Sequence, residues 1–355
     1  MNGTNSTENA SSSIADEDYD VDLIGVPRHP IQIEIVISAF LWSVTFFIIA
    51  GNVLVFVSFA KDPKLLTGVQ NLLILNLASA DLMVGACMIF CNLLRYYDNW
   101  PFGEGICRLQ LLLDYTSTSQ STCTIILLSL DRYLIVKMKL KYNTFMTRRK
   151  AIFSILVTWG LSLMMFMPLI GETFWGPTTW VDYSVTCDAA VLYNASYHVI
   201  LLTVFIVIPI VLLTYFNVVV FLDIRTRSRG LPPRKYSNRI EATPLPLVSV
   251  IAPPQATAAQ RRIQIVKPVV RRRNSQRDRT ASIRLIVIVV LYMICWLPYC
   301  ITHLVYTLYA EFEISTMLLV SVYYLVWFNS AINPCIYAIG HRRIRTSMQK
   351  LICFW

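Results

Sequence analysis

The chain has 355 residues, of which 55% are hydrophobic and 15% are charged, and its mean hydropathy is +0.55. A soluble domain usually carries roughly 25% charged residues, so this composition argues against a soluble enzyme or binding module. The net charge of +10 is concentrated, because residues 225–284 hold 15 Lys or Arg against two acids. Such a basic run indicates a solvated cytoplasmic loop rather than a nucleic-acid-binding surface.

Residues 1–30 are polar and acidic, and they contain glycosylation acceptor motifs at Asn2, Asn5 and Asn9. Three acceptors within ten residues favour an extracellular or lumenal tail. No apolar stretch follows a basic start here, so we expect the first membrane helix to act as the insertion signal.

Seven stretches follow that are long enough to cross a bilayer as helices. We expect spans at residues 31–59, 69–97, 105–137, 149–170, 193–224, 281–309 and 315–339. Basic residues cluster after the first, third, fifth and seventh spans, so the positive-inside rule places the amino terminus outside. The predicted fold is an all-α membrane protein, a seven-transmembrane helix bundle over residues 31–339. Cys107 and Cys187 alone lie in apparently external segments, which makes them the disulfide candidate.

Two cytoplasmic segments complete the predicted organisation. Residues 225–279 are rich in Pro and Arg without apolar periodicity, so we expect a disordered loop. Residues 340–355 predict a short amphipathic helix along the membrane, with Ile344, Met348 and Ile352 facing the lipid. Cys353 is a candidate palmitoylation site, and a free thiol is an equally good interpretation.

The third span is too polar to lie against lipid, since Ser, Thr, Gln and Cys fill its middle. Other helices must therefore surround it. Asp114 and Arg132 are 18 residues apart, which is five helical turns or about 27 Å. One face of this helix thus carries a lone acid near one membrane surface and the Asp131–Arg132 pair near the other.

Asp114 is expected in the outer half of the bundle, where an ionisable group costs several kcal/mol without a partner. A cation arriving from outside would satisfy it, and aromatic faces would add about 0.5–2 kcal/mol each. The alternative is that Asp114 bonds to neighbouring hydroxyl groups and binds nothing. The aromatic residues expected at this depth are Tyr115, Trp296, Tyr299, Tyr323 and Trp327.

Asp81 lies in the middle of the second span, among polar residues expected from other helices. A carboxylate near hydroxyl and amide oxygens suits a hard cation such as sodium. A water-filled polar network without a metal is the alternative. The expected neighbours are Asn52, Ser121, Asn329, Ser330 and Asn333.

The sequence does not predict an enzyme, because it holds no set of nucleophile, base and orienting group and no phosphate-binding glycine loop. The absence of an internal repeat argues against a transporter. The absence of a Lys between Lys267 and Lys350 excludes a retinal-binding opsin.

Taken together, the motifs resemble those of the rhodopsin-like (class A) G-protein-coupled receptors over nearly the whole chain. These motifs are Gly51-Asn52, Leu77-Ala78-Ser79-Ala80-Asp81, Cys107, Asp131-Arg132-Tyr133, Trp159, Pro209, Cys295-Trp296-Leu297-Pro298 and Asn333-Pro334-Cys335-Ile336-Tyr337.

Within that family the chain is most similar to biogenic-amine receptors, and especially to histamine receptors of the third and fourth subtypes. The local matches are Tyr215-Phe216-Asn217, Arg277-Asp278-Arg279 and Trp327-Phe328-Asn329-Ser330. Asp114 stands at the position of the acid that binds the ammonium group. Phe205 replaces the Glu that meets the imidazole in that subfamily, and Thr122 and Tyr292 replace the usual Ile and Phe below the pocket. The implied ligand-binding residues are Asp114, Tyr115, Thr118, Phe205, Trp296, Tyr299, Tyr323 and Trp327.

The resemblance implies a plasma-membrane receptor that binds a histamine-like or other small amine and signals through an inhibitory-type heterotrimeric G protein. Acetylcholine, a trace amine or another quaternary or aromatic amine is the alternative ligand, and a peptide or lipid is a weaker one. Arrestin, receptor kinases and membrane lipid are further expected partners, and sodium at Asp81 is a possible allosteric ion. The residues implied in switching and G-protein coupling are Asp131, Arg132, Tyr133, Leu140, Asp278 and Tyr337.

Overall fold

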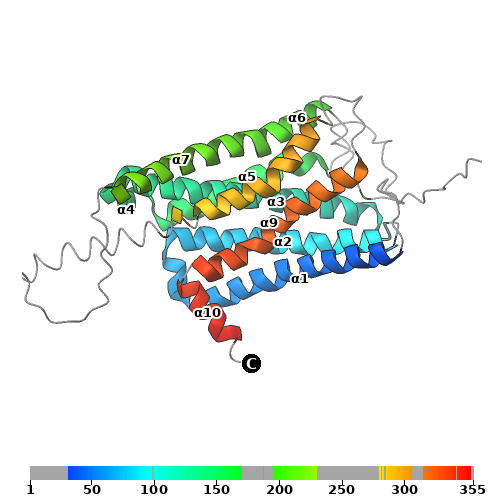
Figure 1. Cartoon of the computed structure of the whole chain (residues 1–355), viewed down its shortest axis with the longest axis horizontal. Helices are drawn as coiled ribbons and strands as arrows, with labels where there is room; N and C mark the ends of the chain where they lie inside the picture. The colour runs from blue at the N-terminus through cyan, green and yellow to red at the C-terminus, as the bar shows by residue number, and fades with distance from the viewer. Residues whose placement is uncertain are drawn as a thin grey trace, which may run out of the picture.

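The protein is an elongated bundle of long helices that run alongside one another (Figure 1). The computed structural model describes residues 31–97, 100–169, 187, 195–229, 280, 282–283, 285–305, 315–340 and 342–352. Within these ranges the secondary structure is helical and contains no strand, so the predicted all-α fold is confirmed.

The long helices match the seven expected spans to within a few residues at most ends. They are α1 (Ile31–Lys61), α2 (Val69–Tyr97), α3 (Gly103–Met138), α5 (Arg148–Phe166), the pair α6 (Ala195–Leu202) and α7 (Ile208–Arg229), the helix Leu285–Val305, and α9 (Thr316–Gly340). Short elements connect them: η1 (Pro63–Thr67), η2 (Lys139–Lys141), α4 (Tyr142–Phe145) and η3 (Met167–Leu169). A helix at the carboxyl end, α10 (Arg342–Ile352), leaves the bundle at an angle (Figure 1).

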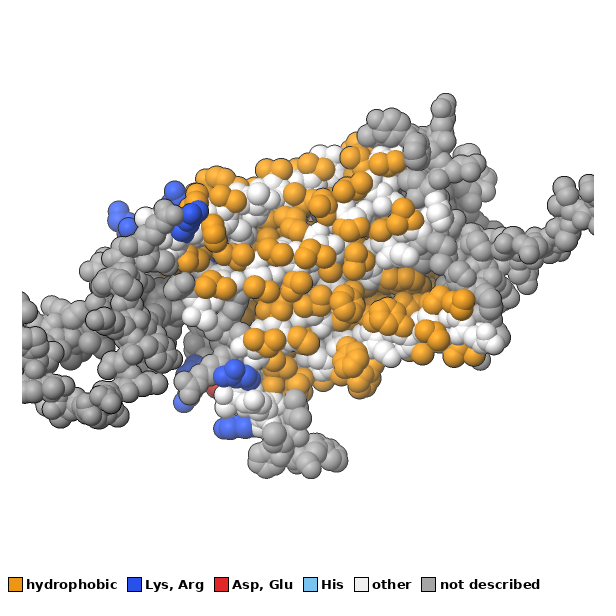
Figure 2. Space-filling model, viewed as in Figure 1, with side chains coloured by type: hydrophobic (Ala, Val, Ile, Leu, Met, Phe, Trp, Pro, Cys, Tyr) orange, Lys and Arg blue, Asp and Glu red, His pale blue; other side chains and the backbone are white. Residues whose placement is uncertain are grey.

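The bundle has the surface of a membrane protein. Hydrophobic side chains cover the middle of the face in Figure 2, and Lys and Arg lie at the end that carries α4 and α10. Five of the described helices are long and apolar enough to cross a membrane by length and composition: α1, α2, α5, α7 and Leu285–Val305. Exposure of this apolar surface to water would be unfavourable, so lipid surrounds this part of the bundle.

Helix α3 differs from these five because its polar middle is buried. It packs against α2, α5 and α7, and Ser117, Gln120 and Thr124 are fully enclosed. Hydrogen bonds between helices satisfy much of this polarity: Ser119 bonds to Ser162 of α5 at 3.0 Å, and Asn76 of α2 donates to Thr124 at 2.7 Å. The expectation that neighbouring helices shelter the third span is therefore confirmed.

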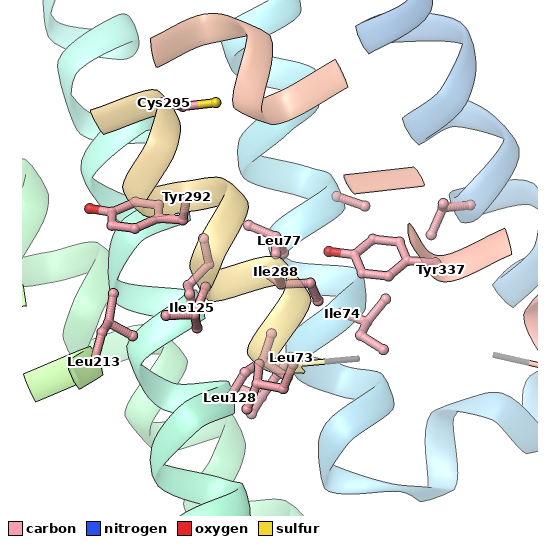
Figure 3. Packing of buried hydrophobic residues seen from close by; sticks show 14 of the residues in the cluster. Leu73, Ile74, Leu77, Ile125, Leu128, Leu213, Ile288, Tyr292, Cys295 and Tyr337 are labelled. Atoms are coloured by element: carbon pink, nitrogen blue, oxygen red, sulfur yellow. The ribbon is translucent and has the colours of Figure 1, made fainter. Parts of the chain in front are cut away.

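The apolar core lies toward the α10 end of the bundle (Figure 3). Most of its buried side chains come from α1, α2, α3, α6, α7, the helix Leu285–Val305, α9 and α10. Helix α1 approaches α9 so closely that a Cβ atom on Gly51 would lie 2.9 Å from the ring of Pro334, which explains glycine at this position. The labelled core residues are Leu73, Ile74, Leu77, Ile125, Leu128, Leu213, Ile288, Tyr292, Cys295 and Tyr337.

The prediction that α10 turns its apolar residues toward lipid is wrong for two of them. Ile344 is fully buried and Met348 is 6% exposed, and both belong to the apolar core. Ser347 of the same helix donates a hydrogen bond to the Ser58 carbonyl of α1 at 3.3 Å. Because the face of α10 that carries these residues packs against α1 and α9, protein rather than lipid covers this part of its apolar face.

Candidate ligand cavity and switch residues

A cavity opens among α3, α5, α6, the helix Leu285–Val305 and α9, on the opposite side of the apolar core from α10. The space open to the centre of a water molecule is about 70 Å³. Its walls are formed by Asp114, Tyr115, Thr118, Ser119, Thr122, Phe166, Leu201, Leu202, Ile206, Trp296, Tyr299, Tyr323, Val326 and Trp327. The structure therefore brings together seven of the eight residues that the sequence assigned to ligand binding. Phe205 lies in the chain between α6 and α7, and its side chain is outside the described part.

Among the described residues that line this cavity, Asp114 is the only acidic one. It is 3% exposed, and the Tyr323 hydroxyl group donates a hydrogen bond to its Oδ2 atom at 3.3 Å. Its Oδ1 atom is buried and accepts no hydrogen bond from the described residues. A carboxylate with an unsatisfied oxygen atom in an enclosed site would be stabilised by a cationic hydrogen-bond donor.

Aromatic rings surround this carboxylate on the side of α9 and the helix Leu285–Val305. The ring centroids of Tyr323 and Trp327 are 4.6 Å apart, and those of Tyr299 and Tyr323 are 6.0 Å apart. Tyr299 also contacts Trp296 edge to face, with the centroids 6.0 Å apart. Such rings attract ammonium groups and exclude water, so they complement the acid of Asp114 chemically.

The wall contributed by α6 and the following turn is apolar. Leu201, Leu202 and Ile206 line the cavity there. The hydroxyl group of Thr203 instead donates to the Val199 carbonyl at 2.8 Å, and Thr203 does not line the cavity. The described side chains of this wall therefore offer a ligand no polar contact.

Sequence reasoning missed seven of the lining residues, and a change of helical period accounts for one of them, Ile206. Residues Thr203–Val207 form a π-helical turn (η6), which inserts an extra residue and changes which side chains face inward. No residue in this stretch marks such a turn in advance. Phe166 of α5 stacks on Tyr115 with centroids 5.5 Å apart, and only tertiary packing shows that contact. The missed residues are Ser119, Thr122, Phe166, Leu201, Leu202, Ile206 and Val326.

The predicted disulfide bond between Cys107 and Cys187 is confirmed. Cys107 is fully buried near the start of α3, seven residues before Asp114. The bond joins positions separated by 80 residues, and it holds Cys187 next to the cavity-bearing part of α3.

Asp81 accepts three hydrogen bonds and is completely buried. Ser121 of α3 and Ser330 of α9 each donate to Oδ1 at 2.8 Å, and Asn333 donates to Oδ2 at 2.8 Å. Three of the expected neighbours thus contact this acid directly. Two do not: Asn329 is buried without a hydrogen bond to Asp81 in the described part, and Asn52 donates to the carbonyl groups of Ile48 and Ser330.

Asp131 and Arg132 form an ion pair at the α10 end of α3, with Oδ2 and Nη2 3.3 Å apart. Two partners not foreseen from the sequence hold this pair. The Tyr142 hydroxyl group donates to Asp131, and Arg132 donates to the Gln70 side chain of α2. Tyr142 belongs to the one-turn helix α4, so the segment after α3 folds back onto its end.

The remaining predicted switch residues have different surroundings. Tyr133 contacts Tyr215 of α7, with hydroxyl oxygens 3.5 Å apart, and Tyr337 is buried in the apolar core. The Tyr337 hydroxyl oxygen has no hydrogen-bond partner among the described residues. The side chain of Leu140 and all of Asp278 lie outside the described part. The same is true of the modification sites Asn2, Asn5, Asn9 and Cys353.

Comparisons with known proteins agree with this arrangement. The model of the seven-transmembrane receptor (rhodopsin) family matches residues 51–337. The chain is 27% identical to the rat histamine H4 receptor over 89% of this chain and 92% of that receptor. It is 26% identical to the human alpha-1A adrenergic receptor, covering 92% of this chain and 70% of that receptor, and 26% identical to the mouse alpha-1D adrenergic receptor, covering 86% and 55%.

The family match covers most of the chain and includes α3, the cavity and the Asp131–Arg132 pair. The prediction that the chain is not an enzyme is also confirmed, because the matching family and the similar proteins are receptors. Membership of this family places the protein at the plasma membrane as a multi-pass receptor coupled to G proteins. The chain belongs to the rhodopsin family of seven-transmembrane receptors and is related to histamine and adrenergic amine receptors.

Proposed function

We propose that this receptor is activated by a small extracellular amine, histamine-like or of another aromatic type, and that it signals through an inhibitory-type heterotrimeric G protein. The observation that carries the proposal is Asp114. Its carboxylate is buried at the wall of an aromatic cavity, and one of its oxygen atoms has no hydrogen-bond partner in the described part. An ammonium group would complete this hydrogen bonding and neutralise the buried charge.

A second ligand class, quaternary or strongly apolar amines such as acetylcholine or a trace amine, is favoured by the composition of the cavity. Four aromatic residues line it close to Asp114, and the α6 wall is apolar. Cation–π attraction needs no hydrogen-bond donor on the ligand, so this wall composition tolerates a methylated ammonium group. The aromatic residues are Tyr115, Tyr299, Tyr323 and Trp327.

The aromatic contacts provide a route from the cavity to the core. Tyr299 contacts Trp296, and Trp296 stacks on Tyr292 with centroids 5.5 Å apart. Tyr292 belongs to the apolar core that also holds Tyr337 (Figure 3). A ligand that contacts Trp296 and Tyr299 differently in two arrangements of this helix would shift the balance between them, and only such a difference has that effect.

At the other end of α3, activation would release Arg132 for the G protein. Arg132 is held by Asp131 and Gln70, and Tyr142 holds Asp131. Loss of these contacts would free a charged donor at the cytoplasmic surface. We assign Tyr133, Leu140, Asp278 and Tyr337 to the same coupling region as a proposal from the family resemblance.

A sodium ion at Asp81 is part of the proposal. The carboxylate and the hydroxyl oxygens of Ser121 and Ser330 meet within hydrogen-bonding distance, and oxygen donors of this kind suit a hard cation. Asn329 and Asn333 are the further residues assigned to this site. A bound cation would neutralise the buried acid. We expect agonist affinity to fall as NaCl replaces a large organic cation at equal ionic strength, and Asp81→Asn to remove that dependence.

Four modifications and the membrane orientation are also proposed. An outward amino terminus would expose Asn2, Asn5 and Asn9 to glycosylation, and Cys353 would be palmitoylated next to α10. Arrestin, receptor kinases and membrane lipid are expected partners. Enzymatic removal of N-glycans from intact cells, followed by gel analysis, tests the orientation and the glycosylation together.

The decisive experiment is a screen of amines for G-protein activation by the full receptor, with Asp114→Asn as the control. The proposal predicts that at least one amine activates the receptor and that Asp114→Asn weakens its potency by about 100-fold or more while surface expression stays normal. An amine response that is unchanged in Asp114→Asn would contradict the assignment of the binding site.

A further inference from the structure

The deep end of the cavity carries one hydroxyl group, which is bonded to a second hydroxyl group behind the cavity wall. Thr122 of α3 lines the cavity, and the Tyr292 hydroxyl group from the helix Leu285–Val305 donates to Thr122 Oγ1 at 3.2 Å. Thr122 in turn donates to the Thr118 carbonyl at 3.3 Å. Both distances are at the long end of the range for protein hydrogen bonds, so neither bond is tight.

The direction of these bonds determines what the pair can still accept. A hydroxyl group has one hydrogen to donate and two lone pairs to accept with. Both hydrogens are used, that of Tyr292 toward Thr122 and that of Thr122 toward the backbone. The free capacity of the pair is therefore lone pairs, which fit a hydrogen-bond donor and not an acceptor.

The cavity wall formed by α6 and α9 offers no hydrogen-bond acceptor at this depth among its described side chains. Leu201, Leu202 and Ile206 line the cavity from the α6 side, and Val326 lines it from α9. Ser119, the neighbouring hydroxyl on α3, is bonded to Ser162 of α5 at 3.0 Å. Thr118 also lines the cavity, and its hydroxyl oxygen has no partner among the described residues, but it lies only four residues from Asp114. A polar group at the deep end of a ligand is thus best satisfied by Thr122, since burying it unpaired costs free energy.

The spacing along α3 sets the size of ligand that reaches both ends. Asp114 and Thr122 are eight residues apart, which corresponds to about 12 Å along the helix axis. Hydrogen bonds of about 3 Å at each end leave roughly 6–9 Å between the ammonium nitrogen and the second polar atom. One aromatic ring with a two-carbon amine chain covers that separation.

We propose that Thr122, held from behind the cavity wall by Tyr292, forms a binding subsite for a neutral hydrogen-bond donor, such as a ring hydroxyl group, at the far end of the amine ligand. This inference rests on the proposed function and names the ligand class more closely as arylalkylamines with a donor on the ring. In this receptor the ligand would be held at both ends by α3, at Asp114 and at Thr122, rather than across the bundle by α6.

The same subsite connects the presence of a donor on the ligand to the packing of the apolar core. Tyr292 is 1% exposed, donates to Thr122 and stacks on Trp296, so a donor bound at Thr122 acts through it on the apolar core, to which Tyr292 belongs (Figure 3). Amines with and without the ring donor would then differ in binding strength and also in how far they shift the helix Leu285–Val305.

The test compares 2-phenylethylamine with its 3-hydroxy, 4-hydroxy, 3-fluoro and 4-fluoro derivatives, because fluorine keeps a small substituent and removes the donor. Binding and G-protein activation are measured on the full receptor in membranes. We expect at least one hydroxy derivative to bind about tenfold more tightly than its fluoro counterpart. Thr122→Val should bring this ratio to within about twofold of one, and Tyr292→Phe, which removes the bond that positions Thr122, should reduce it.

Thr116→Val is the matched control, because Thr116 is a buried threonine of the same helix that does not line the cavity. It should keep the tenfold ratio. A ratio near one in the unaltered receptor overturns the subsite, and so does a ratio that survives both variants or a failure to bind any of the five amines while other amines bind. Loss of response to all amines, or an amine response that ignores Asp114→Asn, would instead overturn the proposed function.

Discussion

Two buried carboxylates in one bundle, Asp81 and Asp114, have opposite surroundings. Asp81 accepts three hydrogen bonds of 2.8 Å from Ser121, Ser330 and Asn333. Asp114 accepts one at 3.3 Å from Tyr323, and its other oxygen has no partner among the described residues. Burial alone therefore does not define a ligand site. The difference is that hydrogen-bond donors of the protein reach both oxygen atoms of Asp81, whereas one oxygen atom of Asp114 is left for a donor from outside.

The strongest test of this difference between the two acids is to neutralise each of them separately. Asp114→Asn should weaken amine binding by about 100-fold or more, because a charged hydrogen bond in an enclosed site is lost. Asp81→Asn should change the same affinity by less than about tenfold, measured at fixed sodium by radioligand competition. Equal losses in the two variants would show that Asp114 has no special part in binding.

Without ligand, we expect the order of the two acids to reverse, so that Asp81 contributes more to the free energy of unfolding than Asp114 does. Asp81→Ala leaves three donors unpaired, so we expect it to lower the free energy of unfolding by about 1–3 kcal/mol more than Asp114→Ala does. Thermal melting of both purified variants in the same detergent without ligand measures the difference. A lower melting temperature for Asp114→Ala than for Asp81→Ala would contradict the hydrogen-bond assignment.

A smaller effect is expected from the one bond that Asp114 does accept. Tyr323→Phe removes a neutral donor at 3.3 Å and keeps the ring, so amine affinity should fall by roughly two- to tenfold. Saturation binding on membranes measures this loss. Ser330→Ala, which removes one donor to Asp81 outside the cavity, is the matched control and should leave affinity within about twofold at fixed sodium.

The sequence predicted the acidic residues and their depths in the membrane well, because helical geometry is periodic. In α3, Asp114, Thr118 and Ser121 follow from a 3.6-residue repeat, and the structure finds them at the cavity and at the Asp81 cluster as this spacing requires. The disulfide partners followed from their place outside the apolar runs. In both cases the governing constraint is local or set by the membrane.

Contacts between helices were harder to foresee. Ile206 lines the cavity from within a π-helical turn that no residue pattern marks, and Phe166 enters from α5 by packing on Tyr115. Gln70 and Tyr142 meet the Asp131–Arg132 pair from two other segments. Ile344 was expected to face lipid but is buried. An amphipathic pattern shows that a face is covered without showing what covers it.

The sequence by itself determined a bundle of membrane helices, the buried polarity of α3 and the positions of its charged residues, because the bilayer fixes helix length and penalises unpaired charge. Only the tertiary structure decided which acid is satisfied within the protein and which faces a cavity. That distinction depends on side chains from α2, α3 and α9 meeting at hydrogen-bonding distance, and such distances are set by packing between elements far apart in the chain.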